Sequence, residues 1–237
     1  RGRLDILPTG RNFFSIDNRT LPTPAAWALG EKSANLLVQR YFQDHGRWPR
    51  AVGLSAWGTS NMRTGGDDIA QALALIGVKP KWEPASGRIT GFDVLPLGVL
   101  GRPRIDVTLR ISGFFRDAFP IQIALFDSAV QAVAALDEEA ADNPLAASAK
   151  TGGETLRIFG SKPGAYGAGL QALIDERIWS DKEDLARAYI TWGGYAYGAS
   201  LSGEARHAAF AERLAATEAV VHNQDNCEHD LLESDGY

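Results

Sequence analysis

The chain has 237 residues, of which 45% are hydrophobic and 22% are charged, so it can bury a substantial core and is too apolar for long disorder. Its formal net charge of -5 offers no basic surface for nucleic acid, and its apolar runs are too short to span a bilayer, so we expect neither partner. One cysteine excludes an internal disulfide framework, and with no signal peptide visible we expect a cytoplasmic protein.

The first predicted elements are a helix and a strand. Thr23 supplies an N-cap and Pro24 a favoured first helical residue, and apolar residues then recur at helical spacing through Tyr41. Residues 51–56 predict a short buried strand. A turn rich in Gly, Ser, Thr and Asn is expected at residues 58–66.

Asp67 is expected to cap the next helix, which carries one apolar face and stops at Gly77. Residues 105–112 alternate between apolar and polar side chains and predict a strand. A long helix with Pro120 in its first turn is expected to follow.

The second half of the chain predicts further alternation. Residues 137–150 are expected to be a loop or an exposed hairpin tip, and residues 156–159 a strand. Ser180 and Glu183 match a capping box that starts a helix. Residues 202–218 then predict another helix, and residues 219–221 a strand that leads into a polar tail.

This pattern predicts an α/β fold with a mostly parallel open sheet and flanking helices. Ligands of such sheets bind beyond the carboxyl ends of the strands, where we expect the loops at 58–66, 113–117, 160–169 and 222–230 to line one cleft. We expect a single domain, or two closely packed subdomains of about 1–150 and 151–237. The chain begins with Arg and stops just after a dense polar motif, which suggests a piece excised from something longer.

Several common chemistries lack their motifs. The chain carries no G-x-x-x-x-G-K-[ST] phosphate loop, no G-x-S-x-G elbow and no H-E-x-x-H helix. Residues 167–172 fit G-x-G-x-x-A, but residues 160–166 separate them from the preceding strand, which a tight dinucleotide turn does not tolerate. Cys227 has an acidic neighbour that disfavours a reactive thiolate.

Three loops carry candidate anion-binding groups. Arg11 with Asn12 could clamp a carboxylate or form a connecting turn. Arg63 and Thr64 are candidates beside a helix start. Arg116 lies beside aromatic side chains that suit a flat anionic ligand, and its alternative role is an ion pair with Asp117 that braces a helix. The loop at 160–169 could close over a ligand or simply connect two elements.

The last 16 residues concentrate polar groups. They hold the only cysteine, two of the four histidines and five carboxylates. His222 and His229, with acids between them, could bind a divalent ion or relay protons. The alternative is a solvated tail, because their spacing matches no known zinc motif.

Taken together, five ordered motifs resemble the large subunit of aerobic cobaltochelatase, the CobN family, and more loosely that of magnesium chelatase. They read LPTGRN (7–12), AWGTSNMRTGGDDIAQ (56–71), RISGFFRDAFP (110–120), GSKPGAYGAG (160–169) and NQDNCEHDLL (223–232). The resemblance covers nearly the whole chain. It implies a domain of a tetrapyrrole-binding metal chelatase, a ligase that inserts Co(II) into hydrogenobyrinic acid a,c-diamide in cobalamin biosynthesis.

The resemblance also implies partners. Mg-ATP is used by separate AAA+ ATPase and integrin-I-type subunits, in agreement with the missing phosphate loop, and Co(II) is the substrate metal. A magnesium chelatase domain acting on protoporphyrin IX and a non-catalytic module for tetrapyrrole binding or AAA+ docking are the alternatives. A piece of this length is expected to be inactive alone.

With this resemblance, we assign roles to the candidates. Substrate binding is assigned to Arg11, Asn12, Arg63, Thr64 and Arg116. Metal binding is assigned to Asp225, His229 and Asp230, and catalysis to Glu228 and His229, since Co(II) accepts carboxylate and imidazole ligands and either group can take a proton. The family is expected to carry Gln at position 222 and a charged residue at 227. His222 and Cys227 are therefore weaker candidates for essential groups.

Overall fold

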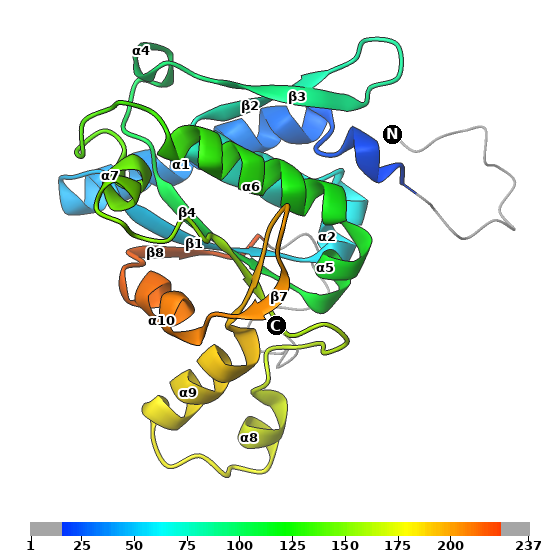
Figure 1. The fold of residues 1–237 in the computed structure, drawn as a ribbon, viewed down its shortest axis with the longest axis vertical. Helices are drawn as coiled ribbons and strands as arrows, with labels where there is room; N and C mark the ends of the chain where they lie inside the picture. The colour runs from blue at the N-terminus through cyan, green and yellow to red at the C-terminus, as the bar shows by residue number, and fades with distance from the viewer. Residues whose placement is uncertain (1–15, 224–237) are drawn as a thin grey trace, which may run out of the picture.

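The computed structural model describes residues 16–223, which form a six-stranded sheet and a separate two-stranded hairpin with helices around them (Figure 1). The large sheet has the order β7-β6-β5-β4-β1-β8. Its strands are β7 (Ser202–Ala205), β6 (Tyr195–Tyr197), β5 (Ile158–Gly160), β4 (Asp106–Ile111), β1 (Ala51–Ala56) and β8 (Ala219–Val221). β5, β4, β1 and β8 pair in parallel, while β6 pairs antiparallel with both β5 and β7. The predicted α/β class and mostly parallel sheet are confirmed.

The helices alternate with these strands. They are α1 (Pro24–His45), α2 (Gly58–Thr64), α3 (Asp67–Ile76), α4 (Leu97–Leu100), α5 (Gly113–Ala118), α6 (Pro120–Ala134), α7 (Pro144–Lys150), α8 (Gln171–Asp175), α9 (Lys182–Gly193) and α10 (His207–Ala215), with a 3-10 turn η2 (Asn18–Thr20). The hairpin pairs β2 (Val78–Trp82) with β3 (Ile89–Val94). None of these helices is both long enough and apolar enough to cross a membrane.

On the side of the sheet where Figure 1 shows α6, α3 contacts β1 and β4 and packs against both α6 and α1. Residues 68–76 of α3 are all buried, so this helix forms the centre of the core. Gly30 allows α1 to approach α3 closely. A Cβ at this position would lie 2.6 Å from both the Ala70 Cβ and the backbone nitrogen of Gln71. The Thr23 cap and the first-turn Pro24 start α1 as predicted.

The opposite face is covered by α10 and α9 (Figure 1), and on that side the sheet buries a charged side chain. Asp106 and Thr108 point to this side of β4 and are only 4% and 2% exposed. Asp106 accepts hydrogen bonds from Nε of Arg157 (2.6 Å) and from Nη1 of Arg213 on α10 (2.8 Å). The polar side of the alternating strand therefore contributes to a buried ion cluster. Its charges are paired because an isolated buried charge is costly.

Three predicted segments are wrong in part. Residues 58–64 form the helix α2 instead of a turn, and residues 144–150 form α7, which Asn143 caps through its side chain. The predicted helix at 202–218 begins as the strand β7 and becomes helical only at His207, because residues 202–205 pair with β6.

Two predicted caps are also corrected. Gly66 is the N-cap of α3 and adopts a left-handed conformation (φ 93), so Asp67 is the first helical residue and not the cap. Asp181 caps α9 in place of Ser180, accepting hydrogen bonds from the backbone N–H groups of Glu183 and Asp184. In both helices the acidic groups lie in the first turn, where the helix dipole favours them.

Candidate functional site

The site is built where four parallel strands end. Trp57 follows β1, Ser112 follows β4, Ser161 follows β5 and His222 follows β8. Cα pairing sets Ala56 opposite Ile111, so the carboxyl ends lie level with one another. The edge of the sheet on which ligands bind in open α/β folds therefore carries side chains from all four strand ends.

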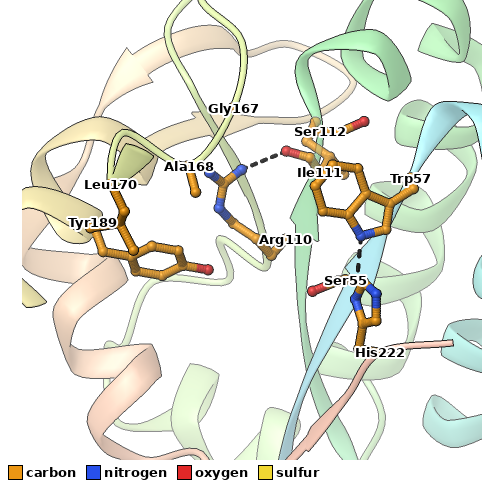
Figure 2. A pocket seen from close by; sticks show the side chains of 10 residues that line it. All are labelled: Ser55, Trp57, Arg110, Ile111, Ser112, Gly167, Ala168, Leu170, Tyr189 and His222. Atoms are coloured by element: carbon orange, nitrogen blue, oxygen red, sulfur yellow. Dashed lines mark hydrogen bonds between the residues drawn. The ribbon is translucent and has the colours of Figure 1, made fainter. Parts of the chain in front are cut away.

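A pocket of about 240 Å³ opens at this edge (Figure 2). Trp57 and His222 stand on one side of it, and Arg110 faces Tyr189 of α9 on the other. The full lining is Ser55, Trp57, Arg110, Ile111, Ser112, Gly167, Ala168, Leu170, Tyr189 and His222. Two aromatic rings and one guanidinium give the pocket an apolar wall with a single fixed positive charge.

Arg110 is the charged group of this pocket. Its Nη1 donates to the carbonyl oxygen of Ile111 (2.5 Å), and its guanidinium lies 5.5 Å from the ring centroid of Tyr189. Nε is buried and has no hydrogen-bond partner, and among residues 16–223 no carboxylate forms an ion pair with this side chain. Gly193 makes room for it, because a Cβ there would lie 3.1 Å from Nε. A half-buried cation without a counter-ion favours an anionic ligand.

Trp57 and His222 are joined to each other. The indole Nε1–H donates to Nδ1 of His222 at 3.3 Å, and the two rings meet edge to face. Burial lowers the pKa of His222, which favours the neutral imidazole that can accept this bond. A glutamine at position 222, which the resemblance leads us to expect in relatives, also has an oxygen that can accept it.

Asp68 forms a second buried polar cluster at the same edge. This carboxylate is 1% exposed, and its Oδ2 accepts from the side-chain amide of Asn61 (2.8 Å) and the backbone N–H of Trp57 (3.4 Å). Its Oδ1 accepts from the amide of Asn223 (2.9 Å). Burial, helped by the neighbouring Asp67 charge, raises the pKa of Asp68 to about 7, against the lowering effect of these hydrogen bonds.

This pKa makes stability depend on pH. Because the folded pKa lies above the ordinary value of 3.8, folded Asp68 holds a proton between about pH 4 and 7 that the unfolded chain has released. Raising the pH through this window therefore favours unfolding, by on the order of 1.4 kcal/mol per pH unit, with no further change above it. Urea unfolding of Asp68→Asn and wild type is expected to show the variant gaining relative stability across the window. Parallel curves would contradict the raised pKa.

Arg116, a predicted substrate-binding residue, is engaged within the chain. Its Nε and Nη2 pair with both carboxylate oxygens of Asp117 (2.7 and 2.8 Å), which lowers the pKa of that acid. Its Nη1 donates to the carbonyl oxygens of Lys162 (2.8 Å) and Ala165 (2.9 Å). These contacts favour the alternative in which the ion pair braces a helix, here α5 against the loop at 160–169.

The other described candidates are the neighbours Arg63 and Thr64, near the end of α2. Arg63 is exposed, and the Thr64 hydroxyl donates to Oδ1 of Asp67 (2.5 Å). Neither residue lines the pocket described above. Their role in substrate binding therefore stays a prediction. The hydroxyl proton of Thr64 is already donated in the hydrogen bond to Asp67.

The remaining candidates lie outside the described residues, and their assigned roles stay predictions. They are Arg11, Asn12, Asp225, Glu228, His229 and Asp230. Within residues 16–223, no three His, Cys, Asp or Glu side chains gather closely enough to hold a metal ion.

Sequence reasoning singled out His222 and the loop at 160–169, which both contribute to the pocket, but it missed Trp57, Arg110 and Tyr189. Trp57 directly follows a predicted strand, which was a usable signal. Arg110 lies on the polar side of a predicted strand. It was used only as evidence for the alternation of apolar and polar residues in that strand. Tyr189 comes from a helix whose approach to β4 nothing in the local sequence indicates. Asp68 was grouped with Asp67 as a helix-start acid, although only Asp68 is buried.

Comparison with known proteins matches the whole chain. A family model described as CobN/Magnesium Chelatase matches residues 1–237. The chain is 62% identical to the aerobic cobaltochelatase subunit CobN of Sinorhizobium sp over its full length, and 34% identical to a magnesium-chelatase subunit of Cereibacter sphaeroides over 98% of it. The catalytic subunit of cobaltochelatase from Mycobacterium tuberculosis superposes with a TM-score of 0.91 at 51% identity over 96% of the chain.

Each of these proteins is much longer. The chain spans 20% of the length of the Sinorhizobium, Cereibacter and Mycobacterium proteins. The match still covers every described helix and strand, and it extends over the motifs at both ends. The chain therefore belongs to the CobN/magnesium chelatase family.

Proposed function

We propose that this chain is one domain of the large, tetrapyrrole-binding subunit of an ATP-dependent cobaltochelatase, which inserts Co(II) into hydrogenobyrinic acid a,c-diamide in cobalamin biosynthesis. The observation that supports this proposal is the similarity to cobaltochelatase subunits along the whole of this chain. The chain is 62% and 58% identical to two of them, against 34% for a magnesium chelatase subunit. Metal insertion requires a grip on the macrocycle, delivery of a hydrated cation and removal of the ring N–H protons.

The pocket at the carboxyl edge suits the first of these tasks. Its volume of about 240 Å³ is below the ~300–1,000 Å³ of sites that enclose a whole small molecule, so it would take one edge of a macrocycle. Arg110 can pair with a carboxylate arm, and Trp57 and Tyr189 offer faces to the ring. Other domains of the longer subunit would supply the remaining walls.

Cobalt delivery and proton removal are assigned to the C-terminal motif. His229 with Asp225 or Asp230 would replace the waters of Co(II) stepwise, and Glu228 or neutral His229 would accept a ring proton. These ligands must bind weakly, because a tight site would not release its metal to the macrocycle. The motif begins at Asn223, directly after the His222 side chain that lines the pocket.

Energy would come from other subunits. The chain has no phosphate-loop motif, so we assign Mg-ATP hydrolysis to an AAA+ ATPase partner, with an integrin-I-type subunit as the connecting partner. This arrangement places the tetrapyrrole site and the ATP site on different chains.

Titration of the full-length subunit with hydrogenobyrinic acid a,c-diamide and with protoporphyrin IX, followed by absorbance, tests the proposal. We expect a spectral change at lower concentration for the corrin precursor. Tighter binding of protoporphyrin IX would assign the chain to magnesium chelation instead. No spectral change with either compound would leave only a docking role for this domain.

A further inference from the structure

The loop at 160–169 holds a tyrosine that is both exposed and fixed. Tyr166 is 59% exposed, and its hydroxyl donates to Oδ2 of Asp117 (2.8 Å). The guanidinium of Arg116 lies 5.3 Å from the ring centroid. The ring also packs over Gly113, where a Cβ would lie 2.6 Å from Cδ1 of the tyrosine. Three contacts therefore set the orientation of a ring that stays largely in solvent.

The group that supports this ring lies inside the fold. Arg116 is 8% exposed and pairs with both carboxylate oxygens of Asp117. Its Nη1 donates to the carbonyl oxygens of Lys162 and Ala165, which tie it to the loop. Because the guanidinium occupies one face of the Tyr166 ring, the exposed area of the tyrosine includes the other face.

A second exposed aromatic side chain is fixed against the same loop. Trp192, near the end of α9, is 37% exposed, and its indole Nε1–H donates to the carbonyl oxygen of Gly167 (3.1 Å). Its ring packs against Gly169, where a Cβ would lie 2.4 Å from Cγ of the tryptophan. Both glycines have a positive φ (75° and 78°), which residues with a Cβ rarely adopt. The glycines therefore let the loop lie directly against the indole.

Both aromatic side chains lie at the rim of the pocket. Gly167, which lines the pocket, directly follows Tyr166 and accepts the hydrogen bond of Trp192. Ser112, which also lines it, directly precedes the Gly113 that contacts the tyrosine ring. Neither aromatic side chain belongs to the lining itself. They therefore extend the apolar wall of the pocket outward, beyond the residues that enclose it.

Burial does not account for the fixed position of these rings. They remove only part of their apolar surface from water, while fixing a side chain costs rotamer entropy. Stacking with a planar ligand requires aromatic faces that are exposed and already ordered before the ligand binds. The pocket of about 240 Å³ is also too small for a whole macrocycle, so most of a bound ring has to lie outside it.

We propose that Tyr166 and Trp192 form an aromatic rim on which the conjugated face of the macrocycle stacks, while one of its carboxylate arms reaches Arg110. This inference rests on the proposed function and adds two binding residues to it. Arg116 and Asp117 are then positioning residues, which act on the macrocycle through Tyr166. The rim accepts large planar ligands in general, whereas Arg110 selects those that carry a carboxylate.

Substitutions in the full-length subunit test the rim, with hydrogenobyrinic acid a,c-diamide as the probe and its absorbance as the readout. Tyr166→Leu and Trp192→Leu are each expected to weaken binding by about 2–10-fold, the factor that corresponds to one aromatic contact. They are also expected to reduce the shift of the macrocycle absorbance band that stacking causes. Phe42→Leu is the matched control, because Phe42 is 41% exposed on α1 and does not line the pocket. Its affinity is expected to equal that of the wild type.

Tyr166→Phe separates stacking from bracing of the loop. This variant loses the hydroxyl bond to Asp117 but keeps the ring, which Gly113 and Arg116 still hold. Stacking therefore predicts an affinity and a band shift close to those of the wild type. If Tyr166→Phe weakened binding as much as Tyr166→Leu, the hydroxyl would be the group that matters, and the proposal would be overturned.

The outcomes separate this inference from the proposed function. If the wild-type subunit binds no macrocycle, the proposed function fails. If it binds the macrocycle and both leucine variants bind it equally well, the aromatic rim alone fails. A lower free energy of unfolding in those variants would then indicate that a neighbouring domain of the longer subunit covers the rings. Should Trp192→Leu not fold, unchanged affinity in Tyr166→Leu is sufficient to overturn the proposal.

Discussion

Asp106→Ala is expected to lower the free energy of unfolding by about 3–5 kcal/mol, the usual cost of removing one partner of a buried ion pair. The carboxylate is 4% exposed and receives hydrogen bonds from Arg157 and Arg213. Its loss leaves two largely buried guanidinium groups between the sheet and α10 without their shared anion. Urea unfolding of the chain, followed by tryptophan fluorescence, measures the effect.

Asp44→Ala is the matched control. Asp44 also pairs with an arginine, Arg40, at 2.8 Å, but its side chain is 44% exposed. An exposed pair of this kind contributes about 0.3–0.5 kcal/mol. Equal losses in the two variants would contradict the assignment of Asp106 as the centre of a buried cluster.

Arg110→Met is expected to weaken binding of hydrogenobyrinic acid a,c-diamide by about 10–100-fold, which corresponds to a hydrogen bond with a charged group of about 1.5–3 kcal/mol. Methionine keeps much of the apolar contact with Tyr189 but cannot pair with a carboxylate. Stability is expected to change little or to improve, because Arg110 has no ion-pair partner in the described part of the chain.

Arg187→Met provides the comparison on α9, where the arginine side chain is 75% exposed. It removes the same charge outside the pocket and is expected to leave the affinity unchanged. If both substitutions weakened macrocycle binding equally, the effect would come from the overall charge of the domain. Arg110 would then not belong to the binding site.

The elements that sequence reasoning found are those with local signals. The Thr23-Pro24 start of α1, the alternation of β4 and the Gly77 stop of α3 each depend on a few neighbouring residues. The order of strands and helices followed from these, and so did the parallel sheet. The position of the loops beyond the strand ends then followed from the strand directions.

The elements that were missed depend on distant partners. Residues 202–205 have the composition of a helix start, but they pair with β6, and β2 and β3 are stabilised by each other. The helix α2 was not predicted because Gly, Ser, Thr and Asn usually favour turns. In the fold, the Asn61 side chain is buried and donates a hydrogen bond to Asp68. Tertiary contacts decided these segments over local preference.

The same distinction applies to the site. The motifs directed attention to the loops beyond the strand ends, yet within them the sequence does not distinguish an arginine that braces the structure from one that faces a pocket. Arg116 and Arg110 both belong to RISGFFRDAFP, and only the fold shows that Asp117 and loop carbonyls occupy the first while the second faces a pocket. Burial and partners, which are non-local quantities, make that difference.

Cobalt insertion by the full-length subunit, assembled with the proposed ATPase partners, tests the central claim most directly. With Mg-ATP, Co(II) and hydrogenobyrinic acid a,c-diamide, the wild type is expected to form the cobalt corrinoid, and Arg110→Met is expected to need at least about tenfold more macrocycle for half-maximal rate. Magnesium insertion into protoporphyrin IX at a higher rate, or cobalt insertion that is indifferent to Arg110, would contradict the account.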